Sequence, residues 1–399
     1  MYARYHIRAT YAALDRQDYL KAWDHVEKAL NGRPGSADLH LLAARVARQN
    51  DRMEEARLHF ERCYELQHGI SEPLQIERMM LAAQTGRAET VLEPLYDYVR
   101  KDHPLSPLIL EALCMGFRQL RSGNVAAYFA NQWLQREPDN VQALICRGVC
   151  FGEMGNFPEA AKDFEKACRI SPDHPGCRLN LGIARLQLAQ FKSAATLFEQ
   201  ALAIEPDNGT ALLGLAQCKI AMNEQEQAQS ILDGLIERDQ ETPEILVERG
   251  KVALQLGQPE VAEKWTRRAY QTMPSYHPAV YQLELCLRTL GITKEADDLG
   301  QQRLQLEADM HQLQELITGV LARPGPHPPK TYHEIGALFL KRGETNQGLY
   351  YLYKALEGDP SLKQTHSLLV QHYEKVGDNE RAKTHREILE VMGPRAGRP

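Results

Sequence analysis

Residues 141–174 read VQALICRGVCFGEMGNFPEAAKDFEKACRISPDH, and much of the chain repeats the spacing of this segment. Small residues recur every 34 positions in two columns: Gly148, Gly182, Ala216 and Gly250 in one, and Ala160, Ala194, Ala228 and Ala262 in the other. Prolines keep the same interval at Pro138, Pro172, Pro206 and Pro274, with Gln240 in the one place where proline is missing. Self-similarity at a fixed period of this length indicates an array of repeats.

The residue types at these positions have a physical reason. Two helices of a hairpin approach closely only where their facing side chains are as small as Gly or Ala. Proline has no backbone N–H, and its ring opposes a helical conformation in the residue before it, so a helix ends near it. The 34-residue period therefore predicts two helices in each repeat, with the second helix ended by the proline.

The 141–174 segment resembles the tetratricopeptide repeat (TPR), with matches at Leu144, Gly148, Phe151, Gly155, Phe157, Ala160, Phe164, Ala167 and Pro172. The resemblance extends over nearly the whole chain and is to the long bacterial-type array built of this repeat alone. It implies an all-α, right-handed superhelix, an α-solenoid of about eleven helical hairpins. The third repeat, around Met79, Gly86, Leu95 and Tyr98, lacks two of the small residues and is shifted by one position.

The repeats predict four regions along the chain. Residues 1–323 form an array of about nine repeats, the last with an extended second helix, and residues 324–330 form a proline-rich hinge. Residues 331–393 form two further repeats, and residues 394–399 a flexible tail. The extended helix follows Thr293 and continues for about 30 residues, or roughly 45 Å.

The extended helix carries apolar residues at heptad spacing: Leu306, Met310, Leu313, Ile317 and Val320. Arg303 interrupts this seam where Leu299 would continue it, so the seam is short for a coiled-coil dimer. We therefore expect it to pack against the terminal repeats of the same chain, and we expect a monomer.

Composition limits the partners and the location. The net charge of −6, from 47 basic and 53 acidic residues, argues against nucleic acid, which usually requires a basic surface. No run approaches the roughly 18 apolar residues of a membrane span, so direct membrane insertion is not expected. The first predicted helix begins at the very start of the sequence. A cytoplasmic location is favoured, and a membrane-tethered or exported one follows if an upstream segment has been removed.

The eight cysteines mostly occupy positions where the repeat requires a small or apolar residue, and buried thiols behave as small apolar groups. The alternative is a metal site made by Cys146 and Cys150 with Cys168, His174 or Cys177. Because no Cys-x-x-Cys pair is present, we predict no metal and no cofactor. Phosphate-binding glycine loops, His-Glu-x-x-His and Gly-x-Ser-x-Gly are absent from the sequence, so we predict no catalytic residues and no enzyme activity.

In the resembled family the first helix of each repeat lines a concave groove that binds partners. The residues at the corresponding positions of repeats five to nine are mostly apolar: Ile145, Val149, Leu179, Ile183, Leu186, Leu213, Gln217, Ile220, Val247, Lys251, Leu254, Tyr281, Leu285 and Arg288. The Lys and Asn clamp of chaperone-binding relatives and the asparagine ladder of glycosyltransferase-linked arrays are both missing. Either tight winding buries these residues within the array, or the groove accepts an apolar peptide.

The sequence therefore predicts a protein-interaction scaffold or adaptor without catalytic activity, which binds a helical or extended apolar segment of a protein or peptide client. One alternative is a membrane-tethered or multisubunit-complex assembly factor. Another is a superhelix that binds single-stranded RNA.

Overall fold

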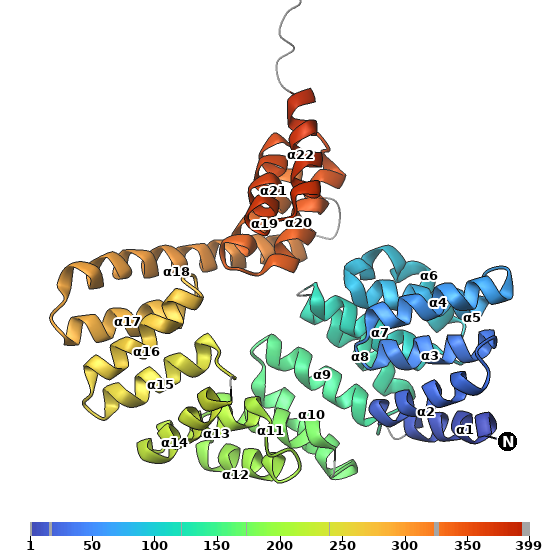
Figure 1. The fold of residues 1–399 in the computed structure, drawn as a ribbon, viewed down its shortest axis with the longest axis horizontal. Helices are drawn as coiled ribbons and strands as arrows, with labels where there is room; N and C mark the ends of the chain where they lie inside the picture. Colours follow the sequence, from blue (N-terminus) through green and yellow to red (C-terminus); the bar gives the residue numbers. More distant parts are fainter. Residues whose placement is uncertain are drawn as a thin grey trace, which may run out of the picture. The chain divides into compact units, whose positions relative to one another are not determined.

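The computed structural model describes residues 2–15, 18–120, 122–172, 174–238, 240–322 and 327–392. Within these residues the chain folds into helices α1 to α22 and one short π-helical segment (Figure 1). The chain divides into two compact units, unit 1 at Met1–Ala184 and unit 2 at Arg185–Pro399. The hinge predicted at residues 324–330 lies partly, and the tail predicted at residues 394–399 entirely, outside the described residues.

Among its described residues, unit 1 contains ten α-helices and the start of an eleventh. They are α1 (Tyr2–Asp15), α2 (Tyr19–Gly32), α3 (Ala37–Gln49), α4 (Met53–Gln67), α5 (Glu72–Ala82), α6 (Ala88–Arg100), α7 (Ser106–Gln119), α8 (Gly123–Arg136), α9 (Val141–Glu153), α10 (Phe157–Ile170) and the first part of α11 (Pro175–Gln187). Consecutive helices pack as hairpins, as α3 does with α4 and α9 with α10.

Unit 2 contains the remaining helices. They are the end of α11, α12 (Phe191–Leu202), α13 (Gly209–Ala221), α14 (Gln225–Glu237), α15 (Pro243–Gln255), α16 (Pro259–Thr272), α17 (His277–Thr289), α18 (Thr293–Ala322), α19 (Pro329–Lys341), α20 (Thr345–Gly358), α21 (Lys363–Lys375) and α22 (Asn379–Val391). Read in pairs, α1 to α22 give eleven hairpins among the described residues, which confirms the all-α solenoid.

The small residues of the repeat lie where the two helices of a hairpin meet. Gly148 on α9 faces Phe164 on α10, and a Cβ atom added to Gly148 would lie 2.6 Å from a carbon of that ring. Ala160, on the opposite helix, is fully buried. Larger side chains at these positions would force the helices apart, because protein interiors are already close-packed.

The turn between the two helices of a repeat has a left-handed residue at one fixed position. Positive φ angles recur at intervals of 34 residues at Gly155 (76°), Ala189 (55°), Asn223 (64°), Gly257 (72°) and Gly291 (75°). Gly favours this conformation because it has no Cβ, and Asn tolerates it better than most residues. The turn therefore keeps its geometry in every one of these repeats, even where the residue is Ala.

The third repeat departs from this geometry by one residue, as its sequence predicted. A π-helical segment at Ala83–Arg87 joins α5 to α6, and Thr85 (φ −108°, ψ 31°) and Gly86 (φ 88°, ψ 10°) inside it are not helical. The left-handed residue at Gly86 is one position later than the 34-residue interval from Asp51 (φ 57°) requires. The junction of α5 and α6 is therefore one residue out of register with the equivalent turn of the second repeat.

The extended helix α18 has the predicted length of 30 residues, and its apolar seam divides between two cores. Leu313 packs with Tyr332, Ile335 and Phe339 of α19, and Ile317 and Val320 flank the same core cluster. This part of the seam therefore packs within the chain, as predicted.

The other part of the seam differs from the prediction. Leu306 packs with Leu283 and Leu287 of α17, so it completes repeat nine instead of contacting the terminal repeats. Met310 is 45% exposed and lies in neither cluster. A straight helix rotates away from a strict heptad pattern, so α18 changes its buried face as it passes from α17 to α19.

Six histidines form three pairs, each with one residue on the first helix of a repeat and the other 19 positions later on the second. The Nδ1 atoms lie 3.1 Å apart in His6 and His25, 2.9 Å apart in His40 and His59, and 3.0 Å apart in His366 and His385. The pairs belong to the first two repeats and to the last one. Seven of the eight cysteines are buried and Cys168 is half-buried, in agreement with their predicted place in the packing.

Candidate functional site

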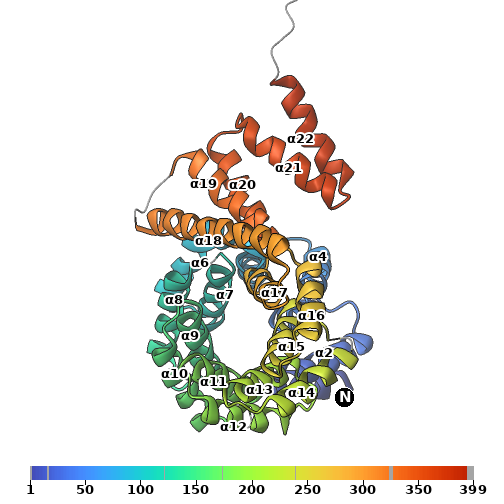
Figure 2. The same cartoon turned by 90° about the vertical axis from the view of Figure 1, so that its left-hand side faces the viewer.

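The predicted groove residues lie on the first helices of five successive repeats. Ile145 and Val149 lie on α9, the next three residues on α11, and three each on α13, α15 and α17. In unit 2 the first helices pack on one another, α13 on α15 and α15 on α17. Figure 2 shows α13, α15 and α17 on one face of this stack and α14 and α16 on the other.

The accessibility of these residues changes along the array. Ile145 is 8% exposed and Val247 only 1%, so both belong to the packed core. Tyr281 and Leu285 on α17 are 50% and 37% exposed. Between these extremes, the half-buried residues are Val149, Leu179, Ile183, Leu186, Leu213, Gln217, Ile220, Lys251 and Leu254.

We call the unit 2 part of this set, without the buried Val247, the first-helix face; it comprises Leu186, Leu213, Gln217, Ile220, Lys251, Leu254, Tyr281, Leu285 and Arg288. Its leucine and isoleucine side chains on α13 are anchored below, since Leu213 and Ile220 pack on the core cluster that contains Ala216 and Leu232. These side chains are therefore held by the core on one side and still expose apolar atoms to solvent on the other.

Two polar members of the face, Gln217 and Lys251, are bound to a shared carboxylate. Gln217 on α13 donates to Oε1 of Glu248 on α15 over 3.2 Å, and Lys251 Nζ lies 2.9 Å from the same oxygen. Glu248 is buried and these two contacts compensate its charge. Both side chains are thereby held in place, and the residues that they flank on α13 and α15 are apolar.

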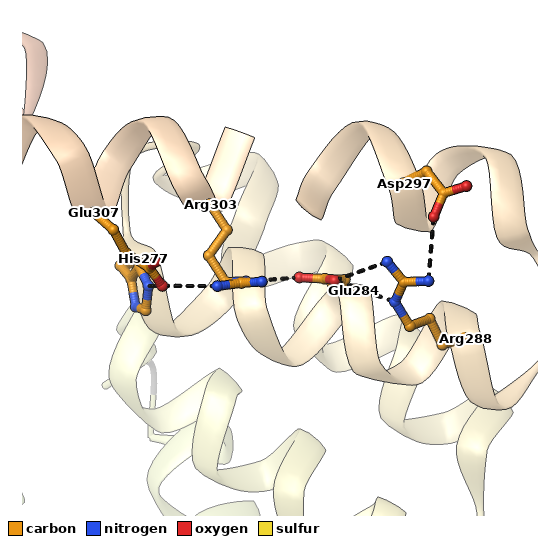
Figure 3. Close-up of polar contacts among 6 residues, drawn as sticks. All are labelled: His277, Glu284, Arg288, Asp297, Arg303 and Glu307. Atoms are coloured by element: carbon orange, nitrogen blue, oxygen red, sulfur yellow. Dashed lines mark hydrogen bonds and ion pairs between the residues drawn. The ribbon is translucent and has the colours of Figure 1, made fainter. Parts of the chain in front are cut away.

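Arg288 begins a chain of charges between α17 and α18, drawn in Figure 3. Its guanidinium lies 3.1 Å from Glu284 and 3.2 Å from Asp297. Glu284 also accepts from Arg303 over 2.9 Å, and Arg303 lies 2.8 Å from Glu307. Glu307 contacts His277 at 3.0 Å. Arg303, which interrupts the heptad seam, therefore has a structural role in joining the two helices.

Glu284 is the buried centre of this chain. Burial raises its pKa, but hydrogen bonds from Arg303 and Arg288 outweigh the burial and leave the pKa below its usual value. Gly300 on α18 makes room for the carboxylate, because an added Cβ would lie 3.1 Å from Glu284 Oε1. The charge chain fixes the orientation of Arg288 at the edge of the first-helix face.

Unit 1 holds a buried polar cluster that the sequence reasoning missed. Arg48 on α3 is fully buried, and it donates to Glu77 over 3.2 Å and to Gln84 over 3.0 Å. Arg45 pairs with the other oxygen of Glu77. Burial raises the pKa of Glu111 on α7, although the neighbouring Arg48 opposes this.

Tyr19, at the start of α2, lies close to this cluster, although the residues of the cluster are distant from it in the sequence. Burial, followed by the proximity of Glu111 and Cys146, raises the pKa of its phenol. The sequence did contain a sign of this cluster, because Arg45, Arg48 and Glu111 are charged residues at the groove positions of the repeat. The groove was predicted from these positions in repeats five to nine only. In unit 1, Arg45 and Arg48 at these positions pair with Glu77 inside the protein.

The cysteines considered as metal ligands divide into two groups. Cys114 Sγ lies 3.9 Å from Cys150 Sγ, and hydrogen bonds to Cys146 and Cys150 raise the pKa of Cys114. Cys168 and Cys177 interact with each other instead, and this contact raises the pKa of Cys177. In the described part of the chain, no three His, Cys, Asp or Glu side chains are grouped as metal ligands.

The described helices contain none that combines the length and the apolar character needed to span a membrane. The fold itself is typical of interaction scaffolds that carry no catalytic site.

Comparisons with known proteins agree with the architecture. Two tetratricopeptide repeat family models match, one at residues 141–174 and one at residues 185–249. No curated protein matches the sequence significantly.

Solved structures resemble the chain at low identity. One is a tetratricopeptide repeat protein from Parabacteroides merdae, with 17% identity, a TM-score of 0.40, and coverage of 71% of this chain and 98% of that chain. The human IFIT1 dimer with m7Gppp-AAAA has 15% identity, a TM-score of 0.47, and coverage of 90% and 91%. The Cut9–Hcn1 hetero-tetramer of the APC/C has 13% identity, a TM-score of 0.41, and coverage of 98% and 94%. At these TM-scores the similarities carry no functional argument.

Proposed function

Because this chain belongs to the tetratricopeptide repeat family, whose fold serves protein interactions, we propose that it is a non-catalytic adaptor that binds an apolar segment of a protein partner on the first-helix face of unit 2. The observation that carries the proposal is the exposure of Tyr281 and Leu285, at 50% and 37%, one helical turn apart on α17. Large exposed apolar side chains that adjoin others on neighbouring helices commonly mark interaction sites.

The chemistry of the face favours an amphipathic helix or an extended apolar segment. Half-buried leucine and isoleucine side chains on α13 and α15 continue the apolar surface of α17. Gln217 and Lys251 are both bound to Glu248, so the charge of Lys251 is paired and the amide of Gln217 is engaged. A few anchor residues of a bound helix, at i, i+3, i+4 and i+7, would supply most of the affinity.

The test uses a fluorescent 16-residue helical peptide with leucines at i, i+3, i+4 and i+7, and a peptide of the same composition in scrambled order. We expect the amphipathic peptide to bind more tightly, and we expect Leu285→Asp to reduce its affinity by about tenfold or more in fluorescence anisotropy. Leu304→Asp on α18 is the matched control, since Leu304 is 52% exposed and outside the face.

Equal binding of the two peptides, or binding that Leu285→Asp leaves unchanged, would contradict the proposal. A single-stranded RNA oligonucleotide that binds instead, with affinity falling steeply as salt rises, would favour the RNA-binding alternative.

A further inference from the structure

A cleft of about 950 Å³ lies in unit 1 between α4, α5 and the π-helical segment, and no residue of the first-helix face lines it. Phe60, Tyr64, Ile70 and Leu81 give it apolar walls. Ile70 is 57% exposed and Tyr64 is 46% exposed, so two large apolar side chains remain in contact with solvent there. The volume falls within the range of protein pockets that bind ligands.

The cleft lies where the array departs from its period. Thr85, one of the two non-helical residues of the π segment, lines it, and so does Arg87 at the end of that segment. The two small residues that allow close packing of the second helix elsewhere are missing from this repeat. The irregular third repeat therefore contributes part of the cleft wall directly.

Arginine side chains supply the unbalanced charge of the cleft. Both acidic residues of the lining are already paired, Glu61 with Arg57 at 2.8 Å and Glu65 with Arg62 at 2.7 Å. Arg78 and Arg87 also line the cleft, and both are exposed. Neither guanidinium has a hydrogen-bond or ion-pair partner among the residues that the structure describes. The charges that remain free in the cleft are therefore both positive.

We propose that this cleft binds a short segment of a partner protein in which aspartate or glutamate side chains alternate with large apolar ones. The apolar side chains would cover Tyr64 and Ile70, and the carboxylates would pair with Arg78 and Arg87. A guanidinium matches a carboxylate through two parallel hydrogen bonds, which gives such contacts specificity as well as attraction. The site lies in a different unit from the first-helix face and recognises a different chemistry.

A nucleic acid fits this cleft less well. Its backbone would bring a row of phosphates against two free arginines and two glutamates, whereas nucleic-acid sites usually offer several uncompensated basic residues. An acidic and apolar peptide uses both features of the cleft at once.

The test compares three labelled 12-residue peptides that share four leucines and carry aspartate, asparagine or lysine at four intervening positions. By fluorescence anisotropy we expect the aspartate peptide to bind roughly tenfold more tightly than the asparagine peptide, and the lysine peptide to bind least. The preference for aspartate should shrink as sodium chloride rises from 50 to about 500 mM, because salt screens exposed ion pairs.

Two double variants separate the site from the overall charge. Arg78→Ala with Arg87→Ala should abolish the preference for the aspartate peptide. Arg4→Ala with Arg8→Ala, which removes the same charge from exposed positions of α1, should preserve it. Leu285→Asp should also preserve it, so failure of this site and failure of the proposed function give different results.

Equal affinity for the three peptides, no binding of the aspartate peptide, or an aspartate preference that survives the loss of Arg78 and Arg87 would each overturn the proposal. Circular dichroism of both double variants confirms that they are folded, as expected for substitutions at exposed positions.

Discussion

His385 Nδ1 donates a hydrogen bond to His366 Nδ1, 3.0 Å away, and the surrounding atoms determine this direction. His366 Nε2 lies 3.0 Å from the carbonyl oxygen of Pro360, which can only accept, so the proton of neutral His366 is on Nε2. His366 Nδ1 must then accept from His385. The hydroxyl of Tyr353, 3.3 Å from His385 Nε2, donates to that ring in turn.

This arrangement predicts that stability falls as the solution becomes acidic. Burial, and then the neighbouring His366, lower the pKa of His385, and burial and His40 lower that of His59 in the second repeat. The unfolded chain therefore binds more protons than the folded one once the pH falls below the ordinary value of 6.5. We expect the melting temperature to fall by a few degrees between pH 7 and pH 5.

The control for this prediction is a double variant, His59→Gln with His385→Gln, since glutamine can donate and accept hydrogen bonds but does not titrate. Its melting temperature should depend less on pH than that of the wild type. Identical pH profiles for the two proteins would show that the paired histidines do not cause the acid destabilisation.

Two glycines on α9 should respond in opposite ways to the same substitution. Gly148→Ala should destabilise the protein by about 1–2 kcal/mol, because the new methyl group overpacks against Phe164. Gly152→Ala should stabilise it by about 0.5–1 kcal/mol, since no atom lies within 4 Å of the added Cβ and alanine favours the helix. Denaturation by urea measures both changes. The same sign for both would disprove the packing argument.

Loss of the buried carboxylate in unit 1 should have a large effect. Glu77→Ala leaves the fully buried guanidinium of Arg48 without its charged partner, which should cost about 3–5 kcal/mol of unfolding free energy. Glu54→Ala removes an exposed partner of Arg57 on α4 and should change stability by less than about 0.5 kcal/mol. A loss below about 1 kcal/mol for Glu77→Ala would indicate that water replaces the carboxylate.

Substitutions in the two parts of the α18 seam should also differ in their effect on stability. Leu313→Asp places a carboxylate at a position only 6% exposed in the core shared with α19 and α20, and it should destabilise that region by several kcal/mol. Met310→Asp, one turn earlier and 45% exposed, should have little effect. Hydrogen exchange of α19 and α20 locates the loss.

Light scattering of the same proteins tests the predicted monomer. We expect the wild type to be monomeric at micromolar concentrations. A dimer that dissociates with Met310→Asp would show instead that the exposed part of the seam is an interface between chains.

The repeat period predicted most of the fold because every helix of a solenoid packs mainly on its neighbours. The spacing of Gly148 and Ala160 predicted the hairpins, and the one-residue shift near Gly86 predicted the irregular repeat. The proximity of Tyr19 to Glu111 could not be predicted in this way, since it depends on how successive repeats are wound. For the same reason the sequence could not distinguish buried Val247 from exposed Tyr281, which lie at the same repeat position.

The left-handed turn between paired helices also offers a route to engineering the array. Ala189 occupies that turn at φ 55°, a conformation that costs a residue with a Cβ about 1–2 kcal/mol. Glycine at this position would remove the clash of the Cβ atom. Part of this gain would be lost because glycine has more conformational freedom in the unfolded chain, so the free energy of unfolding should rise by up to about 1 kcal/mol. Of the equivalent turns, Gly155, Gly257 and Gly291 already have glycine, while Asn223 (φ 64°) offers a similar but smaller gain because Asn tolerates this conformation better. The two substitutions are 34 residues apart and would add almost independently. The array could then be stabilised at these two turns without altering a single residue of either proposed binding surface.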